Sequence, residues 1–241
     1  MHKYKNFINY AHRGASEYAP ENTFLSFYLG LYMGANGIET DVQLTKDGVL
    51  VLFHDQTLER VTGEKGNLSD YTLSQLKTFS VKKNGLADKI ITFEDFLIHF
   101  AHKDLTFAIE LKGDKTAIPT ADLLRKYDMV SKTIVTSFKF KELVDFGNYA
   151  PEFRTGYLAL EEIDNTLLNK MKAHGIQELC PNAEVITKEK VDNWKSMGFE
   201  VRAWGVSTPE IMKNVFHTGI NGMTVNFPDL LTEYYKEIEN K

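Results

Sequence analysis

The sequence predicts a closed (β/α)8 barrel, a TIM barrel, with a small insertion after the second strand region. Short β-prone runs alternate with amphipathic helical runs, and about eight strand–helix pairs can be counted along the 241 residues. Parallel strands need crossover helices, so this alternation implies a parallel sheet. An open doubly wound sheet is the alternative, but its Gly-x-Gly-x-x-Gly turn is missing after the first strand.

The first third of the chain carries the clearest element signals. An apolar run at 7–11 predicts a strand that ends at His12, and a helix capped by Asn22 or Thr23 follows it. Residues 37–44 predict the second strand, which turns back at Asp47-Gly48 into a returning strand at 49–53. Residues 56–89 are looser and polar, with only scattered leucines, so we expect them to be an insertion and not another regular unit.

The remaining chain alternates regularly. The predicted strands are 105–111, 132–137, 154–160, 178–180, 199–206 and 222–225. The predicted helices are 93–101, 118–127, 140–149, 164–174, 188–197, 209–217 and 230–238. We therefore expect residues 1–241 to form one barrel domain, with the insertion at about 56–89.

Composition excludes several classes of protein. The chain is 43% hydrophobic and 25% charged, values typical of a globular protein with a sizeable core. A net charge of -5 gives no reason to expect nucleic-acid binding. Cys180 is the single cysteine, so no intrachain disulfide can form. We find neither a signal-peptide pattern nor an apolar run approaching about 18 residues. We therefore expect a cytoplasmic protein without stable membrane insertion.

Three acidic residues predict a metal site at the barrel mouth. Glu39 and Asp41 alternate along one strand, so both side chains point the same way, and Glu110 ends the next predicted barrel strand. Three close carboxylates need a cation to offset their repulsion, and an all-oxygen set suits Mg²⁺ or Ca²⁺ and not Zn²⁺. A single strand acid is more often structural, so the prediction depends on the group.

Two histidines and two cations complete the candidate site. His12 and His54 follow strand-like segments, and a pair of imidazoles titrating near neutral pH can remove one proton and deliver another. Arg13 can fork onto phosphate oxygens, and Lys112 can add a point charge. In an acidic protein this local set favours an anionic substrate.

Together these motifs resemble the glycerophosphodiester phosphodiesterase family from residue 11 to about 231. The matching motifs are His12-Arg13-Gly14, Pro20-Glu21-Asn22-Thr23, Glu39-Thr40-Asp41-Val42, Asp47-Gly48, His54-Asp55, Glu110-Leu111-Lys112, Ser137-Phe138, Trp204 and Asn226-x-Pro228. The resemblance implies a TIM barrel with an insertion after the His54 region. It also implies an acid/base pair of His12 and His54, with Arg13 and Lys112 on the phosphate. The implied ligands of the divalent cation are Glu39, Asp41 and Glu110.

The implied activity is hydrolysis of small-molecule glycerophosphodiesters to sn-glycerol 3-phosphate and an alcohol. Trp204 looks like the family's aromatic residue on the seventh strand and is expected to pack against glycerol carbons; Phe138 is expected to line the same mouth. The family commonly has Trp-Thr-Val-Asn there, whereas this chain has Trp204-Gly205-Val206-Ser207. That departure concerns the pocket wall and the preferred leaving group or glycerol contacts.

Two other functions remain as alternatives. A related phospholipase D-type barrel would act on lysophospholipid or sphingomyelin, and it would need an apolar landing surface that the polar insertion does not suggest. A barrel that binds a phosphorylated ligand without turnover predicts loss of a catalytic residue, and none is missing. The sequence leaves open the metal, the alcohol, which histidine is the base and the oligomeric state. It also leaves open whether water or the substrate 2-hydroxyl is the nucleophile.

Overall fold

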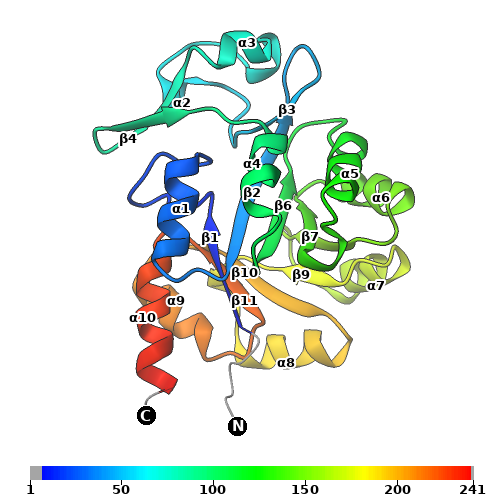
Figure 1. Ribbon diagram of the computed structural model, residues 1–241. Coiled ribbons are helices and arrows are strands. Elements are labelled where there is room, and N and C mark those ends of the chain that lie inside the picture. Colours follow the sequence, from blue (N-terminus) through cyan, green and yellow to red (C-terminus); the bar gives the residue numbers. More distant parts are fainter. Residues whose placement is uncertain (1–6, 240–241) are drawn as a thin grey trace.

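Parallel strands close on themselves to form the barrel that the sequence predicts (Figure 1). The structure is a computed structural model that describes residues 7–239. Within this range β1 pairs with both β2 and β11, which closes a barrel of eight parallel strands. In order around the barrel these are β1 (Ile8–His12), β2 (Gly37–Leu44), β6 (Thr106–Leu111), β7 (Thr133–Ser137), β8 (Arg154–Leu158), β9 (Glu178–Cys180), β10 (Glu200–Val206) and β11 (Gly222–Val225).

Helices cover the outside of the barrel, as their amphipathic patterns predict. They are α1 (Phe24–Tyr32), α4 (Phe93–Phe100), α5 (Ala117–Lys126), α6 (Phe140–Tyr149), α7 (Asn165–Ala173), α8 (Lys188–Ser196), α9 (Pro209–Phe216) and α10 (Pro228–Glu239). Thr23, and not Asn22, caps α1: its side chain accepts from the Ser26 N–H in a capping box. Asn22 has a φ of 57° and points its amide at Asp41, so it belongs to the barrel mouth.

The barrel interior holds a buried polar cluster. Arg202 from β10 donates from Nε to Glu178 Oε2 at 3.1 Å and from Nη1 to Thr224 Oγ1 at 2.8 Å. Its guanidinium carbon also lies 5.0 Å from the ring centroid of Tyr10 on β1. Gly156 makes room for this cluster, since a Cβ there would approach Glu178 Oε2 to 2.7 Å. Each buried charge therefore has a partner, as burial in low dielectric requires.

The insertion has short elements and an apolar core of its own. The hairpin strand β3 (Leu50–Leu52) pairs antiparallel with β2. It leads to α2 (Glu59–Thr62), η1 (Leu68–Asp70), α3 (Leu73–Leu76) and the antiparallel strands β4 (Ser80–Lys83) and β5 (Leu86–Lys89). The buried residues of this insertion core are Val51, Phe53, Leu58, Val61, Leu68, Leu76, Val81 and Ile90. The expectation of a loose polar segment missed this core, because one-turn elements show no apolar period.

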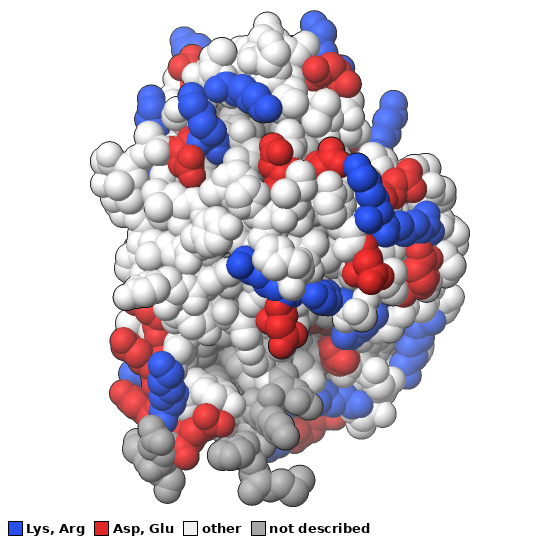
Figure 2. All heavy atoms as spheres, viewed as in Figure 1, with Lys and Arg blue, Asp and Glu red and all other residues white. Residues whose placement is uncertain are grey.

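The insertion lies over the same end of the barrel as the β2–β3 hairpin (Figure 1). On the face that Figure 2 shows, basic and acidic side chains are interspersed, which agrees with the modest net charge. Among residues 7–239, no helix is both long and apolar enough to cross a membrane.

Candidate active site

The three predicted carboxylates meet at the carboxyl end of the barrel. Asp41 on β2 stands directly opposite Glu110 on β6, and Glu39 lies two residues earlier on the same strand face. One oxygen of each carboxylate lies within 4.8 Å of the other two, and all three residues are buried. The proximity that strand alternation predicts is therefore confirmed, and it concentrates three acidic groups in a small space.

The electrostatics of these acids fit a divalent cation. Burial and the Asp41 charge raise the pKa of Glu110 to about 7 and that of Glu39 well above its usual value. Burial also opposes ionisation of Asp41, but Arg13, His54 and Lys112 outweigh it and hold its pKa below the usual range. Within the described residues, Asp41 Oδ1 is buried without a hydrogen-bond partner. An oxygen-seeking cation would relieve the repulsion and satisfy that oxygen.

His12 ends β1 and is held by the last barrel strand. Its Nδ1 lies 2.5 Å from Oδ1 of Asn226, the residue after β11, and that oxygen also accepts from Ser16 Oγ. With a carbonyl acceptor at Nδ1, the imidazole carries its proton there and turns Nε2, 3.8 Å from Glu39 Oε2, toward the carboxylates. Burial and the Arg13 charge lower the pKa of His12 to about 3, so the ring is neutral.

His54 is held from the other side, by the hairpin. The Phe53 N–H donates to the Asp41 carbonyl at 3.1 Å, which places the residue after β3 beside β2. Gln43 Nε2 donates to the carbonyls of Phe53 and Asp55, fixing the backbone on both sides of the histidine. His54 Nδ1 lies 2.6 Å from Asp55 Oδ1, so here too Nε2 is the nitrogen left for chemistry. Burial lowers the pKa of His54 as well.

The two predicted phosphate-binding cations lie beside the carboxylates. Lys112 Nζ donates to Glu110 Oε1 at 2.8 Å and lies 3.9 Å from Asp41 Oδ1. Arg13 has a φ of 55°, and its Nε lies 3.2 Å from Asp41 Oδ2 while Nη1 donates to Glu21 at 3.0 Å. Among the described residues only these two carboxylates pair with the guanidinium, which leaves Nη2 for a ligand.

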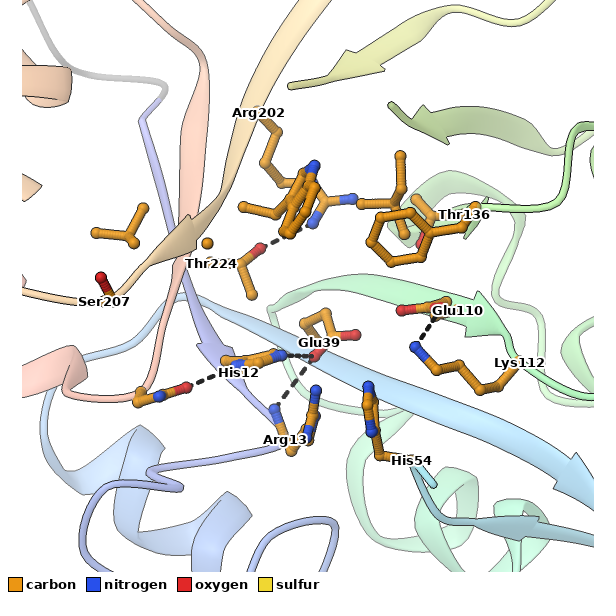
Figure 3. Close-up of a pocket in the computed structure, with 16 residues that line it drawn as sticks. His12, Arg13, Glu39, His54, Glu110, Lys112, Thr136, Arg202, Ser207 and Thr224 are labelled. Atoms are coloured by element: carbon orange, nitrogen blue, oxygen red, sulfur yellow. Dashed lines mark hydrogen bonds and ion pairs between the residues drawn. The ribbon is translucent and has the colours of Figure 1, made fainter. Parts of the chain in front are cut away.

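A cavity of about 250 Å³ opens between these groups (Figure 3). Eight of the nine predicted site residues line it: His12, Arg13, Glu39, His54, Glu110, Lys112, Phe138 and Trp204. Asp41, the ninth, is fully buried behind them. Phe138 and Trp204 form an edge-to-face wall with ring centroids 5.0 Å apart, and Lys112 Nζ lies 5.2 Å from the Phe138 ring centroid. The cavity therefore combines charged groups with an aromatic wall.

At Gly205, where the sequence departs from the family motif, the backbone has a conformation that favours glycine. The β10–β11 register shifts between Ala203 and Val206, and Gly205 in this bulge has a φ of 72°. A Cβ there would also come within 2.9 Å of Asn182 Nδ2. A threonine would be strained in this left-handed conformation, so the cavity rim next to Trp204 has a shape suited to glycine.

The sequence analysis did not predict several residues that contact the candidate site. Asn226 and Asp55 belong to the motifs that resemble the family, but no contact with a histidine was predicted for either. Asn226 follows β11, and Asp55 follows the β2–β3 hairpin. Arg60, whose guanidinium pairs with Asp55 and Glu21, lies in the segment read as loose and polar. Arg202 also lines the cavity, and nothing in the sequence distinguishes it from other strand arginines.

Comparison with known proteins assigns the chain to a family. The model of the glycerophosphoryl diester phosphodiesterase family matches residues 12–230. The chain belongs to this family. A glycerophosphodiester phosphodiesterase of Caldanaerobacter subterraneus subsp. tengcongensis is 32% identical over 235 residues, covering 92% of this chain and 94% of that protein. The protein is therefore an enzyme, a phosphoric diester hydrolase of the glycerophosphodiester phosphodiesterase type.

Solved structures show the same fold. A glycerophosphodiester phosphodiesterase from Thermotoga maritima matches with a TM-score of 0.79 and 26% identity, covering 94% of this chain and 98% of that one. A phosphodiesterase from Oleispira antarctica, in complex with the product sn-glycerol-3-phosphate, matches with a TM-score of 0.86 and 23% identity. It covers 94% of this chain and 96% of the Oleispira chain, and at this identity the likeness concerns the fold.

Proposed function

We propose that this enzyme hydrolyses glycerophosphodiesters to sn-glycerol 3-phosphate and an alcohol by histidine acid–base catalysis that depends on a divalent cation. The observation that carries the proposal is the arrangement of His12 and His54. Each binds an oxygen acceptor through Nδ1, and each lines the cavity that also holds the buried carboxylates. Two imidazoles of fixed tautomer beside one anion-binding cavity match the proton transfers of phosphodiester cleavage.

The protein groups divide the reaction between them. Arg13 and Lys112 bind the phosphate oxygens and favour the extra negative charge that develops in the transition state. One histidine removes the proton of the attacking oxygen with an unprotonated Nε2. The other delivers a proton from Nε2 to the departing alcohol, and for this step it is an imidazolium with protons on both ring nitrogens. Asn226 and Asp55 accept the Nδ1–H of the two rings and so keep Nε2 directed at the cavity in both protonation states.

The metal site and the wall complete the proposal. Glu39, Asp41 and Glu110 would hold Mg²⁺ or Ca²⁺, which supplies positive charge next to the phosphoryl oxygens. Asp41 Oδ1, which accepts no hydrogen bond among the described residues, supports this ligand set. Trp204 and Phe138 would pack against the carbon atoms of the glycerol moiety, because they form the apolar side of the same cavity.

A substrate panel tests the proposal. Purified enzyme is assayed with glycerophosphocholine, glycerophosphoethanolamine and glycerophosphoglycerol, in Mg²⁺, in Ca²⁺ and in excess chelator, and sn-glycerol 3-phosphate is measured. We expect turnover of at least one diester that chelation abolishes and metal restores. Turnover that survives chelation would contradict the metal site, and faster turnover of lysophosphatidylcholine would favour the phospholipase D-type alternative.

A further inference from the structure

We propose that Arg60, in the insertion, is a positioning residue that holds the acid–base group His54 and the phosphate-binding Arg13 in place at the same time. Arg60 does not line the cavity; it acts through two carboxylates, Asp55 and Glu21. The kinetic part of this inference rests on the proposed function, whereas its structural part does not.

The Arg60 guanidinium makes four hydrogen bonds. Two of them go to Asp55: Nε donates to Oδ2 at 2.5 Å and Nη2 donates to Oδ1 at 3.0 Å. The other two go to Glu21: Nη1 donates to Oε2 at 2.8 Å and Nη2 donates to Oε1 at 2.6 Å. Only a planar guanidinium fork matches two carboxylates in this bidentate way, and a lysine ammonium does not.

Each of the two carboxylates also accepts a hydrogen bond from one side chain of the candidate site. Asp55 Oδ1, fixed by Arg60, accepts the Nδ1–H of His54 at 2.6 Å. Glu21 Oε1, also fixed by Arg60, accepts from Arg13 Nη1 at 3.0 Å. Arg13 in turn places its Nε 3.2 Å from Asp41 Oδ2, so the network ends at a predicted metal ligand. One surface residue thus connects the hairpin and the β1–α1 loop.

The insertion core explains how Arg60 is held over the barrel. Arg60 lies on the one-turn helix α2, and its neighbours Leu58 and Val61 are buried in the insertion core. The sequence segment that contributes no catalytic group of its own therefore supplies the residue that orients two of them. This gives the insertion a function beyond covering the barrel end.

The exposure of Arg60 separates positioning from stability. Its side chain is 49% exposed, and ion pairs of a solvent-exposed arginine contribute little to the free energy of unfolding. A small displacement of a catalytic group, in contrast, can lower turnover about 100-fold. Loss of Arg60 should therefore reduce kcat far more than it reduces Tm.

The kinetic test compares Arg60 with a matched surface arginine. Arg125 on the outer helix α5 also pairs with a carboxylate, Glu152 at 2.6 Å, but lies outside the cavity. We expect R60Q and R60K each to lower kcat at least about tenfold with little change in Tm, and R125Q to change neither. Guanidinium ion, but not NaCl of equal ionic strength, should restore much of the kcat of R60A.

A spectroscopic readout makes the test independent of substrate. In the ¹H–¹⁵N spectrum, the hydrogen-bonded Nδ1–H of His54, assigned from the spectrum of H54A, should be present in the unmodified enzyme and in R125Q. It should be lost or shifted by exchange in R60Q. If R60Q keeps this signal, or keeps normal kcat, or if guanidinium fails to rescue R60A while Tm falls, Arg60 is not a positioning residue. An enzyme that turns over no glycerophosphodiester would refute the proposed function, and the His54 signal would still decide the role of Arg60.

Discussion

The two histidines reach the same cavity by different routes. His12 belongs to the barrel itself: it ends β1 and is oriented by the neutral amide of Asn226, just after the neighbouring strand β11. His54 lies outside the barrel strands and is oriented by the charged Asp55, which Arg60 of the insertion holds in turn. Closure of the barrel therefore orients one half of the proposed acid–base pair, and an added segment orients the other.

The two histidines also differ in whether a neutral or a charged group orients them. The Asn226 amide and the His12 ring are held by strand pairing, and their hydrogen bond involves a neutral amide. The Asp55–Arg60 pair depends on two opposite charges, and Arg60 is exposed, so salt screens this pair more strongly. Substitutions and added salt should therefore affect the His12 side and the His54 side of the site differently.

The largest expected effect comes from removing either imidazole. His12→Ala and His54→Ala should each lower kcat by about 10²–10⁴-fold, because each removes one of the two proton transfers. Thermal unfolding of each variant serves as the control for folding, and kcat on a glycerophosphodiester is the measurement. Near-normal turnover by either variant would contradict the two-histidine scheme.

Loss of a carboxylate on the barrel side should come next. Glu110→Gln should weaken binding of Mg²⁺ or Ca²⁺ at least about tenfold, because it removes one of three anionic ligands. Isothermal titration with the metal alone measures this without any substrate. Glu94→Gln, on the outer face of α4, is the matched control. Equal metal affinity in both variants would show that the triad is not the metal site.

The two orienting residues allow the halves to be compared directly. Asn226→Ala and Asp55→Ala should each lower kcat about 10- to 100-fold, because each removes the acceptor that holds the Nδ1–H of one imidazole. The Asn226 variant keeps the Asp55–Arg60 pair, so its kcat should fall between low and moderate ionic strength as salt screens that pair, as in the unmodified enzyme. The pair is absent from the Asp55 variant, so the kcat of that variant should be less sensitive to salt. The opposite pattern would mean that charge does not distinguish the two sides.

The smallest expected effect on chemistry follows from loosening the insertion core. Leu76→Ala removes a fully buried side chain there, and Leu124→Ala removes one from the barrel's outer packing; each should cost about 2–5 kcal/mol of local or global stability. At a temperature where both remain folded, the Leu76 variant should lose several-fold in kcat and the Leu124 variant should not. Tm and kcat measured together separate the two outcomes.

Much of the fold was predictable because it follows from local patterns. Alternation of strand and helix signals predicts the barrel, and the predicted strand at 37–44 agrees with β2 at both ends. Period-two alternation on that strand also places Glu39 and Asp41 on one face, and the structure confirms their proximity to Glu110. The helix cap was a choice between Asn22 and Thr23, and only the contact of Asn22 with Asp41 explains why Thr23 is the cap.

The short elements and the core of the insertion could not be predicted from the sequence, for a physical reason. Its helices and strands are one turn or four residues long, so no apolar period develops, and its core forms only when Leu68 and Leu76 meet Val51 and Ile90 from the chain on either side. The same holds for Arg60, because a single arginine in a polar segment carries no local signal of two carboxylates that lie elsewhere in the sequence.

The sequence by itself determined the barrel, the acidic and histidine residues at its mouth and the family to which they point. These depend on spacing within a strand or on short motifs, which the chain carries locally. Only the tertiary structure decided which nitrogen of each imidazole faces the cavity, that Asn226 and Asp55 orient the rings, and that Arg60 connects the insertion to the site. Hydrogen bonds between residues far apart in the chain decide these features, and such partners are chosen only when the chain folds.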